Sequence, residues 1–410
     1  MRPIVSVIIP TRNRSALLRE ALDSVYAQKG AKSSFGLEVT VVDNASTDST
    51  ADVVSQYPET QYLRLPTNKG AAVARNVGIA AGKGAYVAFL DDDDLWLPGK
   101  LHLQVPVLEA TPEAGAVYSR FVARWGAQPS EPEDVIPNMR VPPSGMVFHR
   151  LLMGNFCGNA LGLLLRRSVL EAVGGFDETL AYGEDYDLWL RLASHAPFSF
   201  VPGIVAVWRL SSHGHYSTGI VDGSRVRTMQ FIVEKALSQL PDTAAARVTR
   251  QRARQMWGIN MLREYTVYQL DLFRPLVLAT LTACPSLVGS RPGRGAIAKC
   301  VRHFAMVSPC PTAAVRSLCE DLRLVAGDRG VGHRIQVRRM LALVWAELAI
   351  GLAASVRTRR EAASALIRSA LLDPTQVLQK PLTAVLRAVR EAVRSLMERR
   401  SPQLSGGTDE

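Results

Sequence analysis

Residues 85–94 read Ala-Tyr-Val-Ala-Phe-Leu-Asp-Asp-Asp-Asp, a short apolar run that is followed at once by four consecutive carboxylates. The run has the length and composition of a buried β-strand. Four adjacent carboxylates at its end repel one another unless a cation or hydrogen-bond donors neutralise them. In parallel α/β sheets, ligands bind beyond the carboxyl ends of the strands, so residues 91–94 mark the expected position of a site.

Strands and helices alternate upstream of this run, in units of about 30 residues. We predict strands at 4–9, 37–42 and 62–65 and helices at about 15–25, 46–56 and 70–82, with Ser15 as the N-cap of the first helix. This alternation predicts right-handed crossovers and a mainly parallel sheet with helices on both faces. The second strand ends at Asp43, so its carboxylate is expected near residues 91–94.

Charge divides the chain near residue 220. Residues 1–220 contain 19 Lys and Arg against 22 Asp and Glu, whereas residues 221–410 contain 29 against 15, which gives the net charge of +11. The second part is rich in Ala, Leu and Arg at helical spacing. We therefore predict an α/β domain over residues 1–220, an all-helical domain of tetratricopeptide-like hairpins over 221–400, and a flexible tail over 401–410.

The basic half lacks the interleaved aromatic residues of a nucleic-acid interface, so nucleic acid is disfavoured as a partner. A solvated helix face explains the arginines, and peripheral contact with an anionic membrane or a lipid-linked acceptor is the alternative. The longest stretch without a formal charge, Leu192–Trp208, has 17 residues and two prolines, whereas a spanning helix needs about 20 apolar residues. With five cysteines, no CxxC pair and no signal peptide, we expect a cytoplasmic protein, with a position at the inner face of a membrane as the alternative.

The four aspartates favour a metal site. In an extended chain, alternate side chains share a face, so Asp91 and Asp93 are expected to point one way and Asp92 and Asp94 the other. Carboxylate oxygens suit Mg²⁺ or Mn²⁺, which proteins usually share with substrate phosphates. A solvated acidic turn is the alternative.

Other ion and phosphate motifs do not fit. A calcium EF-hand loop that began at Asp91 would need Gly and Glu where Trp96 and His102 stand. Residues 78–83 are one residue short of a Walker A loop and lack its final Ser or Thr, and no GxGxxG follows the first strand. The position after a buried strand therefore favours metal–diphosphate binding.

Six blocks of the sequence resemble glycosyltransferase family 2, and they stand in the order expected for it. They are Val5-Ser6-Val7-Ile8-Ile9-Pro10-Thr11-Arg12-Asn13, Val41-Val42-Asp43-Asn44-Ala45-Ser46-Thr47-Asp48, Asn68-Lys69-Gly70 with Arg75-Asn76-Val77-Gly78, Phe89-Leu90-Asp91-Asp92-Asp93-Asp94-Leu95-Trp96, Gly174-Gly175-Phe176-Asp177-Glu178 and Gly183-Glu184-Asp185-Tyr186-Asp187-Leu188-Trp189-Leu190-Arg191-Leu192. The resemblance implies a Rossmann-like GT-A fold, a nucleotide-sugar donor, Mn²⁺ or Mg²⁺, and inversion at the anomeric carbon.

The resemblance also implies which residues hold the nucleoside. Pro10, Thr11 and Asn13 match the loop that lines the nucleoside pocket. Asp43 matches the carboxylate that hydrogen-bonds the nucleobase, typically uracil. Arg75 matches a diphosphate or loop contact, with an exposed helix arginine as the alternative.

Asp91 and Asp93 match the two acids of the DxD motif. The metal is assigned to Asp93, whereas Asp91 and Asp92 reach ribose or metal-bound water, and Asp91 is a second candidate ligand. Residues 207–209, Val-Trp-Arg, resemble a pair that precedes a metal- or phosphate-contacting histidine. The spacing differs here, so His213 is the candidate metal ligand and His215 the alternative.

Asp185 matches the catalytic base, and Glu184 has a supporting role in the acceptor pocket. Asp185 opens a predicted helix, and a helix N-terminus favours the ionised form that accepts a proton. The alternative is a helix-capping acid, which is the role we predict for Asp177. Residues 146–165, with Asn155, Phe156, Gly158 and Asn159, border the acceptor or else form a structural loop and strand.

The sequence thus predicts an inverting, metal-dependent hexosyltransferase that uses a UDP-sugar or related donor and a saccharide or lipid-linked acceptor. Because the QxxRW signature is missing, we expect transfer of one sugar or a few, in bacterial surface polysaccharide or glycolipid assembly. A non-catalytic nucleotide-sugar-binding module of an assembly complex is the alternative. A nucleotidyltransferase is disfavoured because residues 10–14 lack its Gly-rich, basic signature.

Overall fold

The structure is a computed structural model that describes residues 2–30, 34–125, 134–136, 142–210 and 223–266, with nine further positions between 277 and 297. The chain divides into two compact units, residues 1–216 with 228–253 and residues 217–227 with 254–410. The predicted boundary at residue 220, most of the predicted helical domain and the tail 401–410 lie outside the described residues and stay predictions.

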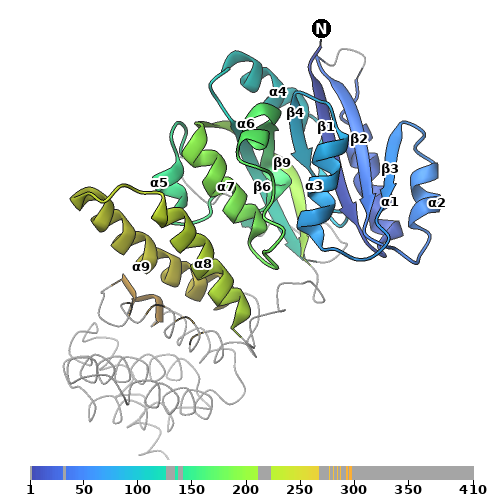
Figure 1. Cartoon of the computed structure of the whole chain (residues 1–410). Helices are drawn as coiled ribbons and strands as arrows, with labels where there is room; N and C mark the ends of the chain where they lie inside the picture. Colours follow the sequence, from blue (N-terminus) through green and yellow to red (C-terminus); the bar gives the residue numbers. More distant parts are fainter. Residues whose placement is uncertain are drawn as a thin grey trace, which may run out of the picture. The chain divides into compact units, whose positions relative to one another are not determined.

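The first half of the sheet follows the predicted alternation. Its strands are β1 (Ile4–Thr11), β2 (Gly36–Asp43), β3 (Thr60–Arg64) and β4 (Tyr86–Phe89), linked by α1 (Ser15–Tyr26), α2 (Thr50–Ser55) and α3 (Ala71–Ala81). The four strands are parallel and lie in the order β3-β2-β1-β4 (Figure 1). Because β1 and β2 run side by side, their carboxyl ends place Thr11 opposite Asp43.

Two local predictions in this half were wrong. Ser15 is the first residue of α1, and Arg14 occupies the N-cap position. The Ser15 hydroxyl accepts a hydrogen bond from Ser49 at 3.1 Å, and the Asp48 carboxylate accepts the Ser15 N–H at 3.0 Å. The second helix begins at Thr50 and not near residue 46. There the Asp48 carboxylate also accepts hydrogen bonds from the Thr50 side chain and backbone, which fixes the helix start.

The second half of the sheet is mixed. It adds β5 (Leu95–Trp96), β6 (Ala116–Trp125), β7 (Asp134–Ile136), β8 (Leu163–Arg166) and β9 (Phe198–Leu210), together with the helices α4 (Lys100–Ala110), α5 (Phe148–Leu151), α6 (Arg167–Ala172) and α7 (Glu184–His195) and the 3₁₀ turn η1 (Ala160–Gly162). The order continues as β8-β6-β9-β5, and β8 runs antiparallel to both β4 and β6. The continuous run of parallel strands therefore ends where the regular strand–helix alternation ends, after β4, although β6 and β9 again pair in parallel.

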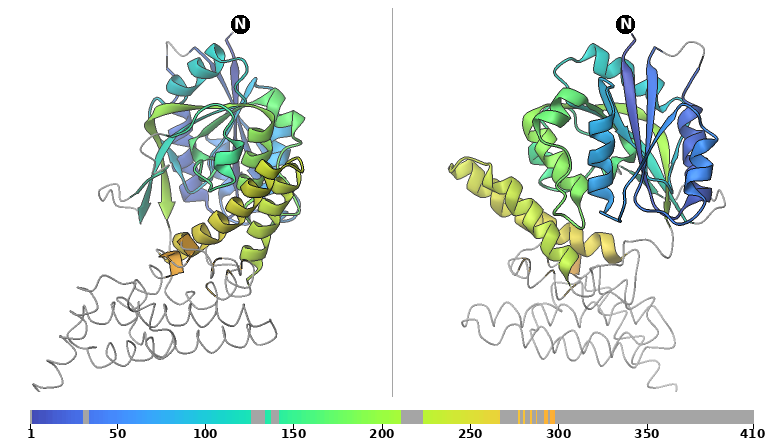
Figure 2. Two further views of the ribbon diagram at one scale, coloured as in Figure 1. Left: turned by 90° about the vertical axis from the view of Figure 1, so that its left-hand side faces the viewer. Right: turned by 45° about the vertical axis from the view of Figure 1, so that its right-hand side comes forward.

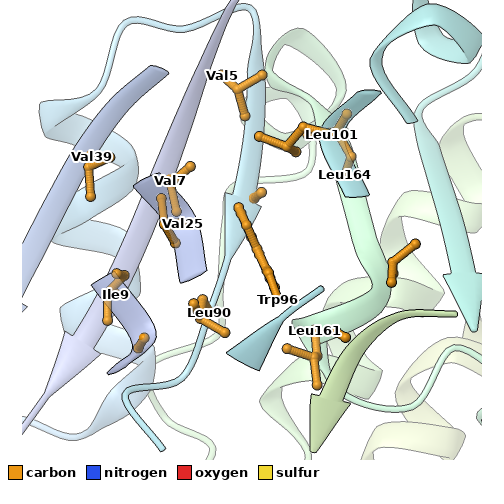
Figure 3. Packing of buried hydrophobic residues seen from close by; sticks show 14 of the residues in the cluster. Val5, Val7, Ile9, Val25, Val39, Leu90, Trp96, Leu101, Leu161 and Leu164 are labelled. Atoms are coloured by element: carbon orange, nitrogen blue, oxygen red, sulfur yellow. The ribbon is translucent and has the colours of Figure 1, made fainter. Parts of the chain in front are cut away.

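Helices cover both faces of the sheet, as predicted. On one face, Val5 and Val7 of β1 are fully buried in a cluster with Val25 of α1, Leu101 of α4 and Trp96 of β5 (Figure 3). This cluster holds the turn between β4 and β5 on a rigid base.

On the other face, α3 lies against β1. A Cβ at Gly78 would overlap the side chain of Ile8, so only glycine allows this close approach. Helices α6 and α7 lie on the same side as α3 (Figure 1), and the Arg167 guanidinium of α6 donates to the Ile79 carbonyl of α3 at 2.9 Å. The site is built on this face.

Two longer helices follow the sheet. They are α8 (Ser224–Ser238) and α9 (Ala244–Thr266), and they lie side by side (Figure 2). Arg250 of α9 donates to the carbonyl of Leu240, which lies in the turn between α8 and α9, at 2.6 Å. None of the helices in the described part of the chain combines the length and the apolar character needed to cross a bilayer.

Candidate active site

The four aspartates form a turn between β4 and β5. The Asp94 N–H donates to the Asp91 carbonyl at 3.0 Å, so the extended conformation that we expected is wrong. The side chains nevertheless alternate in exposure. Asp91 and Asp93 are 33% and 29% exposed, whereas Asp92 is 5% exposed and Asp94 is buried.

The two buried aspartates bind neighbouring segments of the protein. Asp92 accepts hydrogen bonds from Thr11 Oγ1 at 2.7 Å and from the Arg12 N–H at 3.3 Å. Asp94 accepts the Arg209 N–H of β9 at 2.9 Å. The ends of β1 and β9 are thereby joined to the turn, and the predicted contact of Asp92 with ribose stays a prediction.

Arg14 neutralises part of the acidic turn. Its Nη1 lies 2.9 Å from Asp92 Oδ1 and 2.7 Å from Asp93 Oδ2. Burial and repulsion from Asp91 raise the pKa of Asp93 to about 6, although Arg14 opposes the shift. Sequence reasoning missed Arg14. Its position in the loop after β1, which is expected to lie near the aspartates that follow β4, was a usable signal.

Arg75 of α3 joins the turn to helix α7. Its buried guanidinium lies 2.7 Å from Asp91 Oδ1, 2.8 Å from Glu184 Oε1 and 3.7 Å from Asp185 Oδ1. The ring of Phe176 lies 5.3 Å from the guanidinium carbon. The alternative of an exposed helix arginine is therefore wrong, and Arg75 holds acids from two distant segments at one place.

Asp185 is the second residue of α7, after the N-cap residue Gly183. Its side chain is 17% exposed, and its buried Oδ1 accepts no hydrogen bond from the described residues. Burial raises the pKa of Asp185 to about 7; Arg75 lowers it, and the charges of Glu184 and Asp91 raise it. The helix N-terminus favours ionisation, as expected, but burial outweighs it here.

Asp43 is buried beneath the predicted nucleoside pocket. It accepts hydrogen bonds from the Ser46 N–H at 2.8 Å and from the Tyr62 hydroxyl at 2.6 Å, and Arg64 Nε lies 3.7 Å away. Burial and the hydrogen bond to Asp43 raise the pKa of Tyr62 to about 12. Tyr62 was not predicted, because its reach to Asp43 depends on the β2–β3 register, which pairs Tyr62 with Val41, two residues before Asp43.

The loops after β1 and β2 are tied together beside Asp43. Asn13 has a positive φ of 53°, its N–H donates to Ser46 Oγ at 2.9 Å, and its Oδ1 accepts the Thr47 N–H at 2.7 Å. Pro10 and Thr11 end β1 at the same edge. The structure thus brings together all the residues predicted for the nucleoside pocket, and their contacts with a nucleoside stay predictions.

The predicted acceptor segment shows structural contacts. Asn155 Nδ2 donates to the Gly158 carbonyl at 2.9 Å, and the indole of Trp189 donates to the same carbonyl at 3.1 Å. Asn159 caps η1 through a hydrogen bond to Leu161, and Phe156 packs on Tyr118. These bonds favour the alternative of a structural loop, and a role in acceptor binding stays a prediction.

The acidic turn has carboxylates that could bind a divalent cation together with substrate phosphates. The described ranges contain no group of three or more His, Cys, Asp or Glu that could hold a metal ion. Asp91 and Asp93 are both partly exposed, and a cation bound to them would relieve the repulsion that raises the pKa of Asp93. Mg²⁺ is commonly held by one or two carboxylates together with substrate phosphates. His213 and His215 lie outside the described residues.

Comparisons with known proteins show which sequence family this chain resembles. Residues 6–174 match the sequence model of Glycosyl transferase family 2. The chain is 26% identical over 287 residues to an uncharacterized glycosyltransferase of Haemophilus influenzae, which covers 66% of this chain and 90% of that one. It is 29% identical over 193 residues to the Escherichia coli UDP-Glc:alpha-D-GlcNAc-diphosphoundecaprenol beta-1,3-glucosyltransferase WfgD, covering 46% and 69%.

Other matches are partial. Three further curated glycosyltransferases are matched over only 35% to 58% of their own length. The crystal structure of S. aureus TarS superposes with a TM-score of 0.51 at 17% identity, over 82% of this chain and 54% of that one. This likeness concerns the fold and agrees with the predicted GT-A architecture. On the ordered motifs and this match, residues 6–174 of the chain form a glycosyltransferase family 2 region.

Proposed function

We propose that the protein is an inverting glycosyltransferase that moves a sugar from a nucleotide diphosphate-sugar, most simply a UDP-sugar, to an acceptor hydroxyl. The observation that carries the proposal is Arg75, which holds Asp91 of the DxD turn and Asp185 of α7 around one guanidinium. The DxD acids and the proposed base stand about 90 residues apart in the sequence, and the fold brings them together.

In the proposed reaction, Asp185 accepts the proton of the acceptor hydroxyl while that hydroxyl attacks the anomeric carbon. A pKa near 7 suits a general base at neutral pH, because such a group is partly ionised and still basic enough to take a proton. The displacement is a single step that needs no covalent intermediate. The fixed positions of turn and helix would hold donor and acceptor in line, which lowers the barrier further.

On the donor side, Asp43 and the joined loops after β1 and β2 would bind the nucleoside, with the diphosphate next to the DxD turn. Asp93 and Asp91 would hold Mn²⁺ or Mg²⁺, which when bound neutralises charge on the departing diphosphate. Arg14 lies beside Asp93 and adds a positive charge at the same place. Glu184 shares Arg75 with Asp185 and would support the acceptor side.

The proposed acceptor is a saccharide or lipid-linked saccharide of bacterial surface polysaccharide assembly. Support comes from the similarity to WfgD, whose name gives a UDP-sugar donor and a diphosphoundecaprenol-linked acceptor. Peripheral contact with the inner face of a membrane, through the basic residues after 220, stays a prediction because most of them lie outside the described residues.

A donor-hydrolysis screen tests the proposal. Purified protein with Mn²⁺ is incubated with UDP-, GDP- and dTDP-sugars, and release of the nucleoside diphosphate is measured. We expect turnover of at least one donor, its loss in Asp185→Asn with donor binding retained, and no loss in Asp52→Asn, which changes an exposed acid in the first turn of α2. If no donor is bound or cleaved, the proposal fails; if Asp185→Asn keeps full function in cells, a binding module is favoured.

A further inference from the structure

Helix α8 packs on the N-terminal end of helix α7. Gly183, the N-cap residue of α7, has a positive φ of 73°. A Cβ at this position would lie 2.7 Å from Met229 Sδ and 2.9 Å from Ile232 Cδ1, both on α8. The two helices therefore meet directly at the residue that precedes Glu184 and Asp185 (Figure 1).

Beside this contact, Lys235 forms ion pairs with Asp177 and Asp187, which together we call the ionic clamp. Lys235 of α8 places its Nζ 2.7 Å from Asp177 Oδ2 and 2.9 Å from Asp187 Oδ1. Asp187 lies in the first turn of α7, two residues after Asp185, and its buried carboxylate also pairs with Arg191 at 2.7 Å. Asp177 belongs to the loop that leads into the helix. One ammonium group thus joins the helix of the proposed base to the loop before it.

The same loop is held on its other side by α3. Asn76 donates to the Phe176 carbonyl and accepts the Phe176 N–H, both at 2.9 Å. The Phe176 ring in turn packs against the guanidinium of Arg75, which lies beside Asp185. A displacement of this loop would therefore reach the proposed base from two directions, through Arg75 and through the start of α7.

The bond to the loop is a strong one. Hydrogen bonds from Lys235 and from Thr179 lower the pKa of Asp177 to about 2. Lys235 is partly buried, and its two carboxylate partners raise its pKa against the effect of burial. Lys235 and Asp177 are therefore both charged at neutral pH, and their contact is not an incidental surface pair.

We propose that Lys235 is a positioning residue for the base, and that α8 forms part of the catalytic unit. The inference rests on the proposed function, because it takes Asp185 as the base. Lys235 does not touch the proposed substrates; it acts by fixing the first turn of α7 and the loop 176–178. Helix α8 lies beyond residues 6–174, so the part of the chain that matches the family does not contain this device.

The test compares Lys235→Met with Arg247→Met in the full-length protein. Arg247 of α9 is the matched control. It pairs with Asp242, which precedes that helix, at 3.6 Å, and the two side chains are 66% and 79% exposed. For Lys235→Met, we expect kcat to fall about tenfold to a hundredfold, with the Kd for donor unchanged. Lys235→Arg should recover most of kcat, and Arg247→Met should behave as wild type.

Hydrogen exchange gives a second readout that does not depend on turnover. We expect faster amide exchange over residues 184–187 in Lys235→Met and not in Arg247→Met. If Lys235→Met does not fold, Asp177→Asn, which removes only the loop half of the clamp, should show a smaller effect of the same kind. Wild-type kcat and wild-type exchange in these variants would overturn the inference while leaving the transferase intact, whereas an inactive wild type would defeat the proposed function itself.

Discussion

Replacement of Arg75 by methionine removes a guanidinium that faces Asp91, Glu184 and Asp185 together. The substitution keeps much of the side-chain volume but leaves three carboxylates without their partner. Breaking a buried ion pair in this way is expected to lower the free energy of unfolding by about 3–5 kcal/mol. Arg75→Lys keeps the charge and is the matched variant.

The effect on the base follows from the distance between the charges. Arg75 Nη1 lies 3.7 Å from Asp185 Oδ1, and two unit charges at about 4 Å interact by about 4 kcal/mol in a partly buried site. This energy corresponds to about three pH units at most. Because Asp185 is partly exposed and the three acids share Arg75, we expect its pKa in Arg75→Met to rise by about one to three units.

The assay is the pH dependence of kcat/KM between pH 5 and 9. In the wild type, the rate should rise with pH as Asp185, with its pKa raised to about 7, loses its proton. In Arg75→Met, this rise should move to higher pH, and Arg75→Lys should lie between the two. A folded Arg75→Met protein whose profile coincides with that of the wild type would refute the proposed electrostatic role of Arg75.

Three further substitutions test other parts of the structure. Tyr62→Phe removes a hydrogen bond to the buried Asp43, and we expect the free energy of unfolding to fall by about 1–3 kcal/mol in denaturant titrations, with weaker UDP binding. Arg14→Gln frees the carboxylate of Asp93, and calorimetry should show Mn²⁺ binding about threefold to fivefold tighter, as expected for a partly exposed pair. Burial lowers the pKa of Lys100 to about 7, so the folded protein binds fewer protons there than the unfolded chain, and stability should rise with pH between about 7 and 10. Unfolding of Lys100→Met should lack this rise, and an equal slope in both proteins would contradict the burial of a neutral lysine.

The strands of the first half could be predicted because local sequence determines them. Residues 4–9 and 37–42 are runs of β-branched apolar residues, and the structure places strands there with the predicted parallel pairing. The insertion of β8 between β4 and β6 could not be predicted in the same way. Residues 163–166 are three leucines followed by Arg166, and such a short run carries no signal for its neighbours or its direction.

The acidic residues of the site could be predicted more readily from the sequence than its basic residues. A carboxylate at the end of an apolar strand stands out in a sequence, as Asp43 and Asp91 do. Arg75 was singled out only through the family resemblance, because arginine on a helix is usually exposed; its burial beside Glu184 of α7 and the ring of Phe176 is a tertiary feature. Lys235 is harder still to predict, because its partners Asp177 and Asp187 precede it by 58 and 48 residues and lie on other elements.

Asp185 shows why sequence position alone gives an incomplete account of a base. A helix N-terminus stabilises a negative charge by about 0.3–1 kcal/mol, and by about 2 kcal/mol in favourable buried cases. Burial, together with the charges of Glu184 and Asp91, raises the pKa of Asp185 to about 7 although Arg75 lowers it, so the surroundings outweigh the helix N-terminus. The larger effect comes from tertiary packing around the first turn of α7. The sequence motif therefore places the carboxylate, whereas burial and the charges of Arg75, Glu184 and Asp91 set how readily it takes a proton.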